Sequence, residues 1–477
     1  MRFPRTENAL RDFPDALAHI EELERTYVER RPLRNDQQLG AAGDPARPDF
    51  DVAIAGGGLS LLYGAILARR GLKVVIFDRR KIGCGHREWN ISRAELEPLA
   101  RSGLFLPNEV DALVEQEYAR GIVRWHGGGT YPVRHVLDCV VDAETLLTKL
   151  RTLAESANAT LLDHHPLNSY RIGKSAIEVR AGERTFTARL LIDAMGAASP
   201  HAAFDLSCPT VGGVLKGLRE GDDPLAVDSS VGEILVTTED VEEGRQHIWE
   251  GFPRPGGFTA YLFYYCEPDQ LGPRPLMSLY ERFFTTRARY KEGDARLIKP
   301  TYGFIPAYSR LRPMTASPCD RVVLVGDAAG RHSPLTFCGF GSMIRSFLPV
   351  SEALHDRLKK NTLARRSLAS VWSEPAGLGV MGGLTLMMLN RAGDDSNEIN
   401  RLLDVAFSTL SEMGEDSFAA FIRDEIGFTE FITFMRRTAA RHGDIYQQVF
   451  RNLGAGELAS WSARLTKLAF KKWRRAP

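Results

Sequence analysis

The stretch "FDVAIAGGGLSLLYGAILARRGLKVVIFDRR", residues 50–80, constrains the fold more than any other part of the sequence. It reads as a short apolar strand, a glycine turn, a helix and a second apolar strand. Gly56 permits the tight turn, Gly58 lets the backbone approach a pyrophosphate, and the helix N-terminus offers free N–H groups to that anion. Asp78 ends the second strand, where a ribose hydroxyl would be bound. The pattern predicts a dinucleotide-binding βαβ unit; the alternative is a glycine turn with a purely structural role.

One position departs from the G-x-G-x-x-G pattern. Leu61 stands where the third glycine is expected, and we take Ala65 as the next small residue. Helix and strand should therefore pack slightly further apart than in the full pattern. Ser60, at the start of the helix, is counted among the predicted cofactor-binding residues. The acid at position 78 favours an unphosphorylated ribose, as in FAD or NAD.

A second glycine-rich stretch, "VGDAAGRHSPLTFCGFGSMIRS" (325–346), follows a later apolar strand. It resembles the late strand of FAD enzymes of the aromatic hydroxylase and isoprenoid reductase type. The resemblance implies that Asp327 binds the ribityl hydroxyls of FAD; a helix cap is the alternative for this residue. The other residues that it implies as flavin contacts are Gly326, Pro334, Gly339 and Gly341.

Two more segments belong to the same prediction. "LLIDAMGAASP" (190–200), with Gly196, resembles the strand end that such flavoproteins place beside the first glycine loop. "HREWNISR" (86–93) follows the βαβ unit, where a loop of this class passes over the cofactor. We expect Arg87 to face the pyrophosphate or the flavin, with Glu88 as its partner. The alternative, which is compatible with this one, is a helix start with a capping box.

Length, charge and cysteine content limit the remaining possibilities. A chain of 477 residues can hold two or three domains. Lys and Arg total 61 against 60 Asp and Glu, so no nucleic acid or strongly charged partner is indicated. The six cysteines contain no C-x-x-C pair, so no metal site is predicted and a reducing compartment fits. The charged start and the absence of a long apolar run favour a cytoplasmic protein, either free or at the inner face of a membrane.

We predict an α/β fold with a Rossmann-type FAD-binding domain of the aromatic hydroxylase/isoprenoid reductase type, a β-sheet substrate domain and a helical C-terminal part. Strings such as "GEILVTTED" and "TAYLFYYCE" indicate the strands of the substrate domain. The expected boundaries are an N-terminal helix and linker (1–49), the two parts of the FAD-binding domain (50–205 and 320–350), the β-rich substrate domain (206–319) and the helical region (351–477).

Longer strings carry a more specific resemblance. These are "HREWNISRAEL" (86–96), "TTEDVEEGRQHIWEGFP" (237–253), "TAYLFYY" (259–265) and "GDAAGRHSPLTFCGFGSMIRS" (326–346). Together they resemble the lycopene cyclase family of photosynthetic bacteria and its plastid paralogue. The resemblance implies that reduced FAD assists addition of a proton to the terminal double bond of an acyclic carotene, a lipophilic polyene. The cation then closes a ring and loses a proton, without net redox change. NADPH is one source of electrons for the flavin, although no second dinucleotide motif is present.

This chemistry requires a carboxylic acid kept protonated by burial, a dry pocket and electron-rich faces near the cation. Glu250, in an apolar and aromatic neighbourhood, is our first candidate for the acid. The alternatives are a surface glutamate at a strand end, or one paired with Arg254 or Arg87. His332 is the second candidate catalytic residue, with a structural histidine as its alternative.

The C-terminal string "SWSARLTKLAFKKWRRAP" (460–477) has a basic amphipathic pattern. Such a helix lies on anionic membranes or packs on its own domain with a solvated basic face. Two other functions stay open. One is an FAD monooxygenase or reductase acting on another polyene or aromatic substrate, and the other is a non-cyclising carotenoid-binding paralogue. The sequence does not indicate an oligomeric state.

Overall fold

The computed structural model describes residues 2–28, 47–202, 204–307, 317–330, 339–372, 382–391, 393–443, 446–447, 456, 459, 462, 463 and 466. The chain begins with two helices, α1 (Pro4–Ala9) and α2 (Pro14–Val28). Pro14 opens α2 instead of interrupting a longer helix, because the first helical turn does not need the missing N–H group. The basic C-terminal segment, 460–477, lies outside the described residues apart from 462, 463 and 466.

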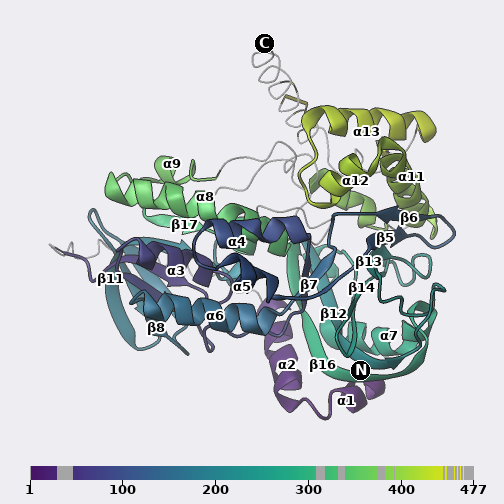
Figure 1. Cartoon of the computed structure of the whole chain (residues 1–477), viewed down its shortest axis with the longest axis horizontal. Coiled ribbons are helices and arrows are strands. Elements are labelled where there is room, and N and C mark those ends of the chain that lie inside the picture. Colours follow the sequence, from purple (N-terminus) through teal and green to yellow (C-terminus); the bar gives the residue numbers. More distant parts are fainter. Residues whose placement is uncertain are drawn as a thin grey trace.

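The first sheet builds the nucleotide half of the molecule, on the left of Figure 1. Its strand order is β8-β2-β1-β11-β10-β9, and β17 also pairs with β11. The neighbouring pairs β8–β2, β2–β1, β1–β11 and β11–β17 are parallel. The strands are β1 (Phe50–Ala55), β2 (Val74–Phe77), β8 (Thr160–Leu162), β9 (Leu167–Ile172), β10 (Ile177–Ala181), β11 (Arg184–Asp193) and β17 (Val322–Leu324).

Helices cover one face of this sheet. Val52 and Ile54 of β1 pack against them, whereas Ala53 and Ala55 point to a second core that contains residues of β9 and β10. A strand buried on both faces is apolar at every position, which explains the continuous runs of β1 and β2. The helices that share the first core are α3 (Leu61–Arg69), α4 (Glu97–Arg101), α5 (Pro107–Asp111), α6 (Ala143–Ser156), α8 (Gly339–Lys359) and α9 (Arg365–Leu368).

The second sheet forms the other half, on the right of Figure 1, and α7 (Pro275–Tyr290) covers one of its faces. Its order is β16-β12-β15-β14-β13-β5-β6. Strands β5 and β6 come from the segment that the sequence division assigned to the nucleotide domain. The bounds are β5 (Arg120–Arg124), β6 (Thr130–Val133), β12 (Leu206–Leu218), β13 (Val231–Val236), β14 (Ile248–Arg254), β15 (Gly257–Phe263) and β16 (Gly293–Ala307).

Smaller elements connect the two halves. A three-stranded sheet has the order β3-β7-β4, formed by β3 (Trp89–Ile91), β4 (Val114–Glu117) and β7 (Cys139–Val141). Short 3-10 turns are η2 (Arg93–Leu96), η3 (Gly196–Ala198), η4 (Pro268–Gln270), η5 (Gly326–Ala329) and η7 (Gly382–Met388). The C-terminal helices pack on the β5–β6 edge of the second sheet; they are α11 (Glu398–Met413), α12 (Glu415–Ile422) and α13 (Phe428–Arg441).

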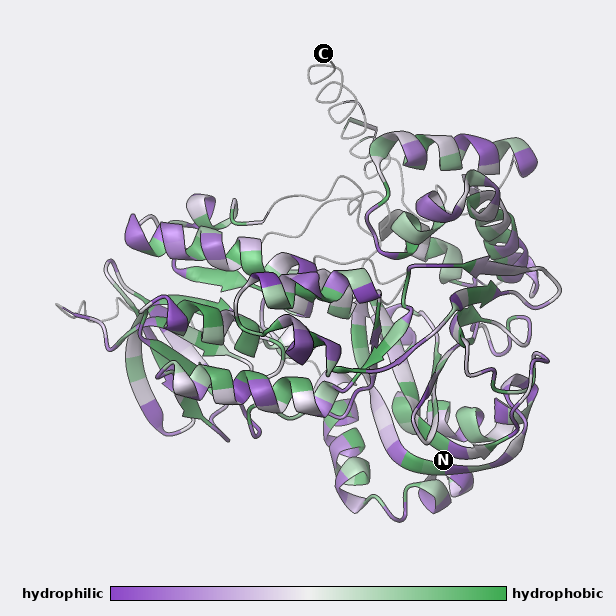
Figure 2. Ribbon diagram, viewed as in Figure 1, coloured by the Kyte–Doolittle hydropathy of each residue, from purple (hydrophilic) through white to green (hydrophobic). Residues whose placement is uncertain are grey.

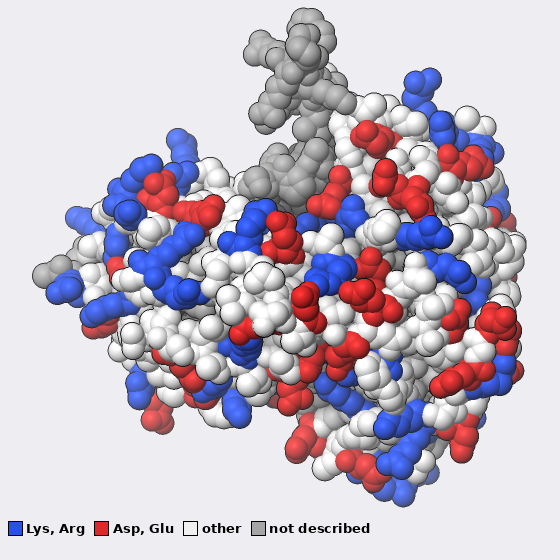
Figure 3. All heavy atoms as spheres, in the orientation of Figure 1, with Lys and Arg blue, Asp and Glu red and all other residues white. Residues whose placement is uncertain are grey.

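The predicted fold class is confirmed, since the molecule combines a Rossmann-type α/β half with a second sheet and a helical C-terminal part. Hydrophobic residues concentrate on the central strands and on the inner faces of the helices (Figure 2). On the face shown in Figure 3, acidic and basic side chains are interspersed, as the near-zero net charge suggests. Within the described residues, no helix is long and apolar enough to cross a membrane.

Candidate active site

The glycine turn after β1 has the geometry of a dinucleotide site. Gly56 has φ +111°, and a Cβ atom there would lie 2.6 Å from the carbonyl oxygen of Ala194, so only glycine fits without strain. A Cβ atom on Gly58 would meet nothing within 4 Å, because this residue faces a cavity. The Ser60 hydroxyl donates a hydrogen bond to the carbonyl oxygen of Gly56 and fixes the turn before α3. The turn thus leaves backbone N–H groups and open space for an anion.

Asp78 lies beside this turn and lines the same cavity. Its carboxylate accepts hydrogen bonds from the N–H groups of Gly57 (2.7 Å) and Arg80 (2.8 Å). A carboxylate has about four acceptor sites, so it can hold the loop and still bind a ribose hydroxyl.

The expected wider spacing at Leu61 is wrong, because Gly64 takes over the role of the third glycine. A Cβ atom on Gly64 would lie 2.3 Å from Cδ1 of Ile76 in β2. At Gly64, one turn after Leu61, α3 thus packs against the Ile76 side chain of β2 with no room for a Cβ atom. Ala65 is buried but is not the residue that sets this approach.

The later glycine segments meet the first turn at the carboxyl ends of the strands. Gly326 has φ +60° and opens η5, so that Asp327 faces the cavity. A Cβ atom on Gly196 would lie 3.7 Å from Cβ of Asp327, so these residues are neighbours. Gly339 also lines the cavity, but a Cβ atom on Gly341 would instead lie 2.5 Å from Glu95 Oε1, and Gly341 is not among the lining residues. His332 and Pro334 lie outside the described residues.

Three adjoining cavities run between the two halves of the molecule. A cavity of about 680 Å³ borders Gly58 and Asp78, and one of about 600 Å³ borders Gly196 and Asp327. A third, of about 290 Å³, adds Glu250 from the second sheet. Arg87 lines all three cavities and Gly58 lines two. The three cavities share lining residues, and together with the glycine turn and the acidic residues beside them they leave room for an extended dinucleotide.

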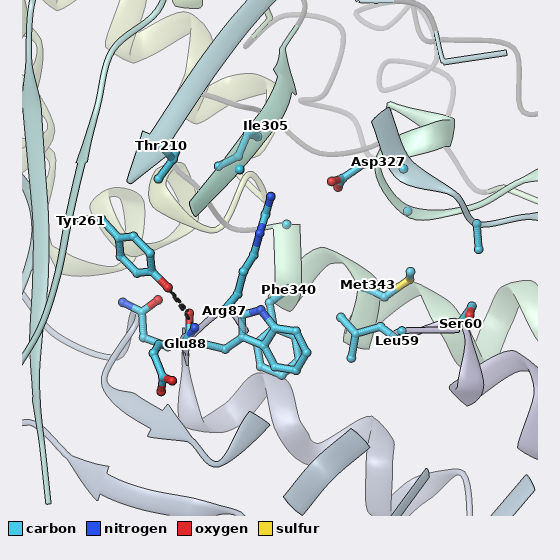
Figure 4. Close-up of a pocket in the computed structure, with 18 of the residues that line it drawn as sticks. Leu59, Ser60, Arg87, Glu88, Thr210, Tyr261, Ile305, Asp327, Phe340 and Met343 are labelled. Carbon is cyan, nitrogen blue, oxygen red and sulfur yellow. Dashed lines mark hydrogen bonds between the residues drawn. The ribbon is translucent and has the colours of Figure 1, made fainter. Parts of the chain in front are cut away.

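Arg87 crosses the space between the two halves (Figure 4). Its side chain extends between Thr210 and Ile305 of the second sheet and the residues of the nucleotide half, with Asp327 opposite. A Cβ atom on Gly303, which has φ +154°, would lie 2.7 Å from the Arg87 guanidinium. The glycine in β16 therefore leaves the room that this side chain occupies.

Glu88 is not the partner of Arg87 that the sequence suggested. Its buried carboxylate pairs with Arg254 and, at 2.7 Å, with Lys299. Its backbone N–H donates to the Tyr261 hydroxyl, which donates in turn to the Glu88 carbonyl oxygen, each at 2.9 Å (Figure 4). These contacts fix the loop that carries Arg87 to the second sheet.

The candidate acid, Glu250, points into the cavity because successive side chains of β14 point to opposite faces of the sheet. Trp249 packs on α7, where its ring stacks on Tyr290 at 4.6 Å, so the next side chain points to the opposite face of the sheet. Glu250 is only 6% exposed, and Asn90 Nδ2 donates a hydrogen bond to its Oε1 at 3.2 Å. Burial raises the pKa of Glu250 to about 8, partly offset by this hydrogen bond.

Glu250 is neither a surface glutamate nor the ion-pair partner of Arg254 or Arg87. Arg254 pairs with Glu88 and Glu115 instead. Among the described residues, no cation forms an ion pair with Glu250. Glu239, another acid of the 237–253 string, binds Arg289 at 2.9 Å and also pairs with Arg282, so it attaches this segment to α7. Burial without an ion-pair partner among the described residues therefore favours the protonated form of Glu250.

Sequence reasoning missed several residues of the site. Asn90 reaches Glu250 from 160 positions away, and Tyr261 reaches Glu88 from 173. Asp193, at the end of β11, lies directly before the lining residue Ala194 and is itself buried; burial raises its pKa to about 6, although Ser199 donates to it at 2.6 Å. The sequence indicated where the strands end, but it did not indicate which distant side chains these residues contact. Gly64 had a direct signal, because it is the next glycine after Gly58 within the βαβ stretch.

Comparison with known proteins places this geometry in a structural class. No protein-family model and no curated protein matches the chain. Halogenase PltM, solved in complex with phloroglucinol and FAD, is 14% identical with a TM-score of 0.57, covering 90% of this chain and 93% of that chain. A geranylgeranyl bacteriochlorophyll reductase-like protein (Ta0516) from Thermoplasma acidophilum is 14% identical, with a TM-score of 0.54 and coverage of 84% and 98%. The Diels-Alderase PyrE3 of pyrroindomycin biosynthesis is 16% identical, with a TM-score of 0.54 and coverage of 80% and 81%. The chain therefore shares the fold of these proteins, one of which, the halogenase, was solved with FAD bound.

Proposed function

We propose that the protein binds FAD and, with the flavin reduced, cyclises the end groups of an acyclic carotene without net redox change. The observation that carries this proposal is Glu250, a buried carboxyl group without an ion-pair partner among the described residues, in a cavity that Gly196 and Asp327 also line. Flavin-dependent oxidation alone does not require such an acid, whereas protonation of an unactivated alkene does.

The glycine turn and the residues around it would hold the cofactor. Gly56, Gly58 and the start of α3 fit the diphosphate, and Asp78 fits the adenosine ribose. Asp327 lies where ribityl hydroxyls would pass between the larger cavities and the Glu250 cavity. Bound reduced FAD would supply an electron-rich surface beside a developing positive charge.

The chain's own residues supply the proton and the surroundings of the cation. Glu250 donates a proton to the terminal C1=C2 double bond, the C1 cation bonds to the C5=C6 double bond, and loss of a proton completes the ring. Asn90 orients the carboxyl group through Oε1. Trp89 and Phe340, stacked at 4.8 Å, line the same cavity and offer aromatic faces to the cation. The apolar walls also exclude water, which would otherwise capture the cation as an alcohol.

Fold similarity gives independent support for a substrate of this chemical class. One structural neighbour is described as geranylgeranyl bacteriochlorophyll reductase-like, a description that refers to an isoprenoid chain. A polyene end group would meet Glu250 at the wall that the second sheet contributes to this cavity, opposite the cofactor residues Gly196 and Asp327.

The decisive experiment is an anaerobic incubation of the protein with chemically reduced FAD and lycopene in liposomes prepared in heavy water. Mass spectrometry should show a ring-closed isomer that carries one deuterium per ring and is otherwise unchanged in composition. Glu250→Gln should abolish this product, because an amide cannot donate the proton. Glu220→Gln, at an exposed position beyond β12, should retain it. Recovery of unaltered lycopene from a protein that binds FAD would overturn the proposed reaction.

A second candidate is FAD-dependent oxidation or reduction of another unsaturated or aromatic substrate. It is supported by the halogenases among the structural neighbours, one of which was solved with phloroglucinol and FAD. Consumption of oxygen or NADPH that depends on the added substrate would favour it over cyclisation.

A further inference from the structure

Helix α2 lies against the cofactor cavities, far in sequence from the nucleotide motif. In Figure 1 it stands below the junction of the two halves, beside β16. Arg25 and Thr26 line the cavity of about 680 Å³ together with Gly58 and Asp78. The cavity of about 600 Å³, next to Gly196 and Asp327, is lined on the α2 side by His19, Leu23, Thr26 and Tyr27.

A buried carboxylate anchors α2 to the second half of the molecule. Glu24 is 3% exposed and accepts hydrogen bonds from Arg274 Nε (2.7 Å), Leu276 N (2.8 Å) and Met277 N (3.0 Å). The last two donors are first-turn N–H groups of α7, where a negative charge is favoured by the helix dipole. This contact holds the middle of α2 in a fixed position.

An aromatic stack holds the end of α2 nearest the cavities. The Tyr27 ring lies parallel to that of Phe304 in β16, with 3.9 Å between centroids and 6° between planes. The Tyr27 hydroxyl is 2.9 Å from the Ser207 hydroxyl in β12. The helix is thus mounted on the second sheet, and its adjacent residues, Arg25 and Thr26, face the cleft.

Helix α2 contacts the nucleotide half through His19 and Glu22. The partly buried His19 ring lies 3.2 Å from Arg80 through its Nδ1 and meets the His86 ring edge-on at 5.4 Å. Glu22 lies 3.8 Å from Arg79 and 3.9 Å from Arg80, with nearly half of its side chain exposed. Such exposed pairs contribute little to stability. The helix is therefore anchored on the second sheet and also spans the cleft to the nucleotide half through His19 and Glu22.

Arg25 adds positive charge to a cleft that is already basic. Arg79, Arg80, Lys81 and Arg87 line the same cavity, and Asp78 is the acid among its lining residues. Among the described residues, Arg25 forms no ion pair that would neutralise it. A dinucleotide diphosphate carries two negative charges, so a cation on α2 completes a basic enclosure around it.

We propose that α2 is a wall of the cofactor site, which closes the cleft over a bound dinucleotide diphosphate and places Arg25 in its field. This inference rests on the proposed binding of FAD. It assigns to the N-terminal segment a role in cofactor affinity and release, separate from the glycine motif.

The test compares two charge reversals in the full chain. Arg25→Glu alters the cleft, whereas Arg11→Glu makes the same change at an exposed residue between α1 and α2 that lines none of the three cavities. FAD binding is measured by flavin fluorescence, and hydrogen exchange is followed in peptides that cover α2. We expect Arg25→Glu to raise the Kd on the order of tenfold, Arg11→Glu to leave it unchanged, and FAD to slow exchange in α2 of the wild-type protein. Thermal unfolding of each variant without FAD confirms that both are folded.

The outcomes separate this inference from the proposed function. If wild-type protein binds FAD but both variants bind equally well and exchange in α2 does not respond, the role of α2 is refuted and FAD binding stands. If wild-type protein does not bind FAD, the proposed function fails and the inference fails with it.

Discussion

Replacing Glu250 with glutamine tests whether this position holds a proton at neutral pH. Burial raises the pKa of Glu250 from 4.5 to about 8. Over this interval the folded protein retains a proton that the unfolded chain has released, so its free energy of unfolding falls as pH rises. The loss is about 1.4 kcal/mol for each pH unit and sums to roughly 5 kcal/mol between the two pKa values. Glutamine has nearly the same shape and does not titrate, so the variant lacks this loss.

The assay is urea unfolding of both proteins at a series of pH values from 4 to 9. We expect the two stabilities to run in parallel below about pH 4.5 and above about pH 8, and to diverge in favour of Glu250→Gln in between. Curves that remain parallel across the whole range would refute the reasoning, because they would mean that the carboxyl group ionises in the folded protein as it does in water.

The same proton predicts the pH dependence of turnover. If the protonated carboxyl group is the acid, the cyclisation rate falls as pH rises through about 8. Asn90→Ala removes the hydrogen bond that lowers the pKa of Glu250, so the fall should move to higher pH. A shift to lower pH would contradict the assigned role of Asn90.

Two other substitutions test the surroundings of Arg87, each with a matched control. Tyr261→Phe removes a hydroxyl bonded to the buried backbone of Glu88 and should cost about 1–3 kcal/mol in urea unfolding. Tyr264→Phe removes a buried hydroxyl that has no hydrogen-bond partner among the described residues and should cost nearly nothing; equal losses would contradict this assignment. Gly303→Ala places a Cβ atom 2.7 Å from the Arg87 guanidinium and should weaken FAD binding about tenfold. Gly272→Ala, also at positive φ (+75°) but without a neighbour within 4 Å, should leave FAD affinity unchanged.

The nucleotide half could be predicted from sequence because its determinants are local. Gly56, Gly58 and Asp78 lie within one βαβ unit, where backbone conformation and strand burial follow from adjacent residues. The spacing error at Leu61 arose inside the same motif, since Gly64 was present in the sequence and provides the close approach to Ile76.

The sequence contained less information about the position of Glu250 than about the dinucleotide motif. The pattern of β14 indicates that Trp249 and Glu250 point to opposite faces of a sheet. It does not indicate which face carries α7 and which meets the nucleotide half. That choice follows from the packing of Trp249 on Tyr290, and it gives Glu250 its burial and raised pKa.

The sequence by itself determined the dinucleotide motif, the strand-rich second segment and the acid that could act near the flavin. Only the tertiary structure decided that Arg254 serves Glu88, that Asn90 reaches Glu250, and that α2 lines the cofactor cavities. The physical reason is the distance along the chain between the residues that interact. Turn geometry and strand burial are fixed by neighbours along the chain, whereas pKa, ion pairing and cavity shape depend on groups that approach only when the two sheets pack together.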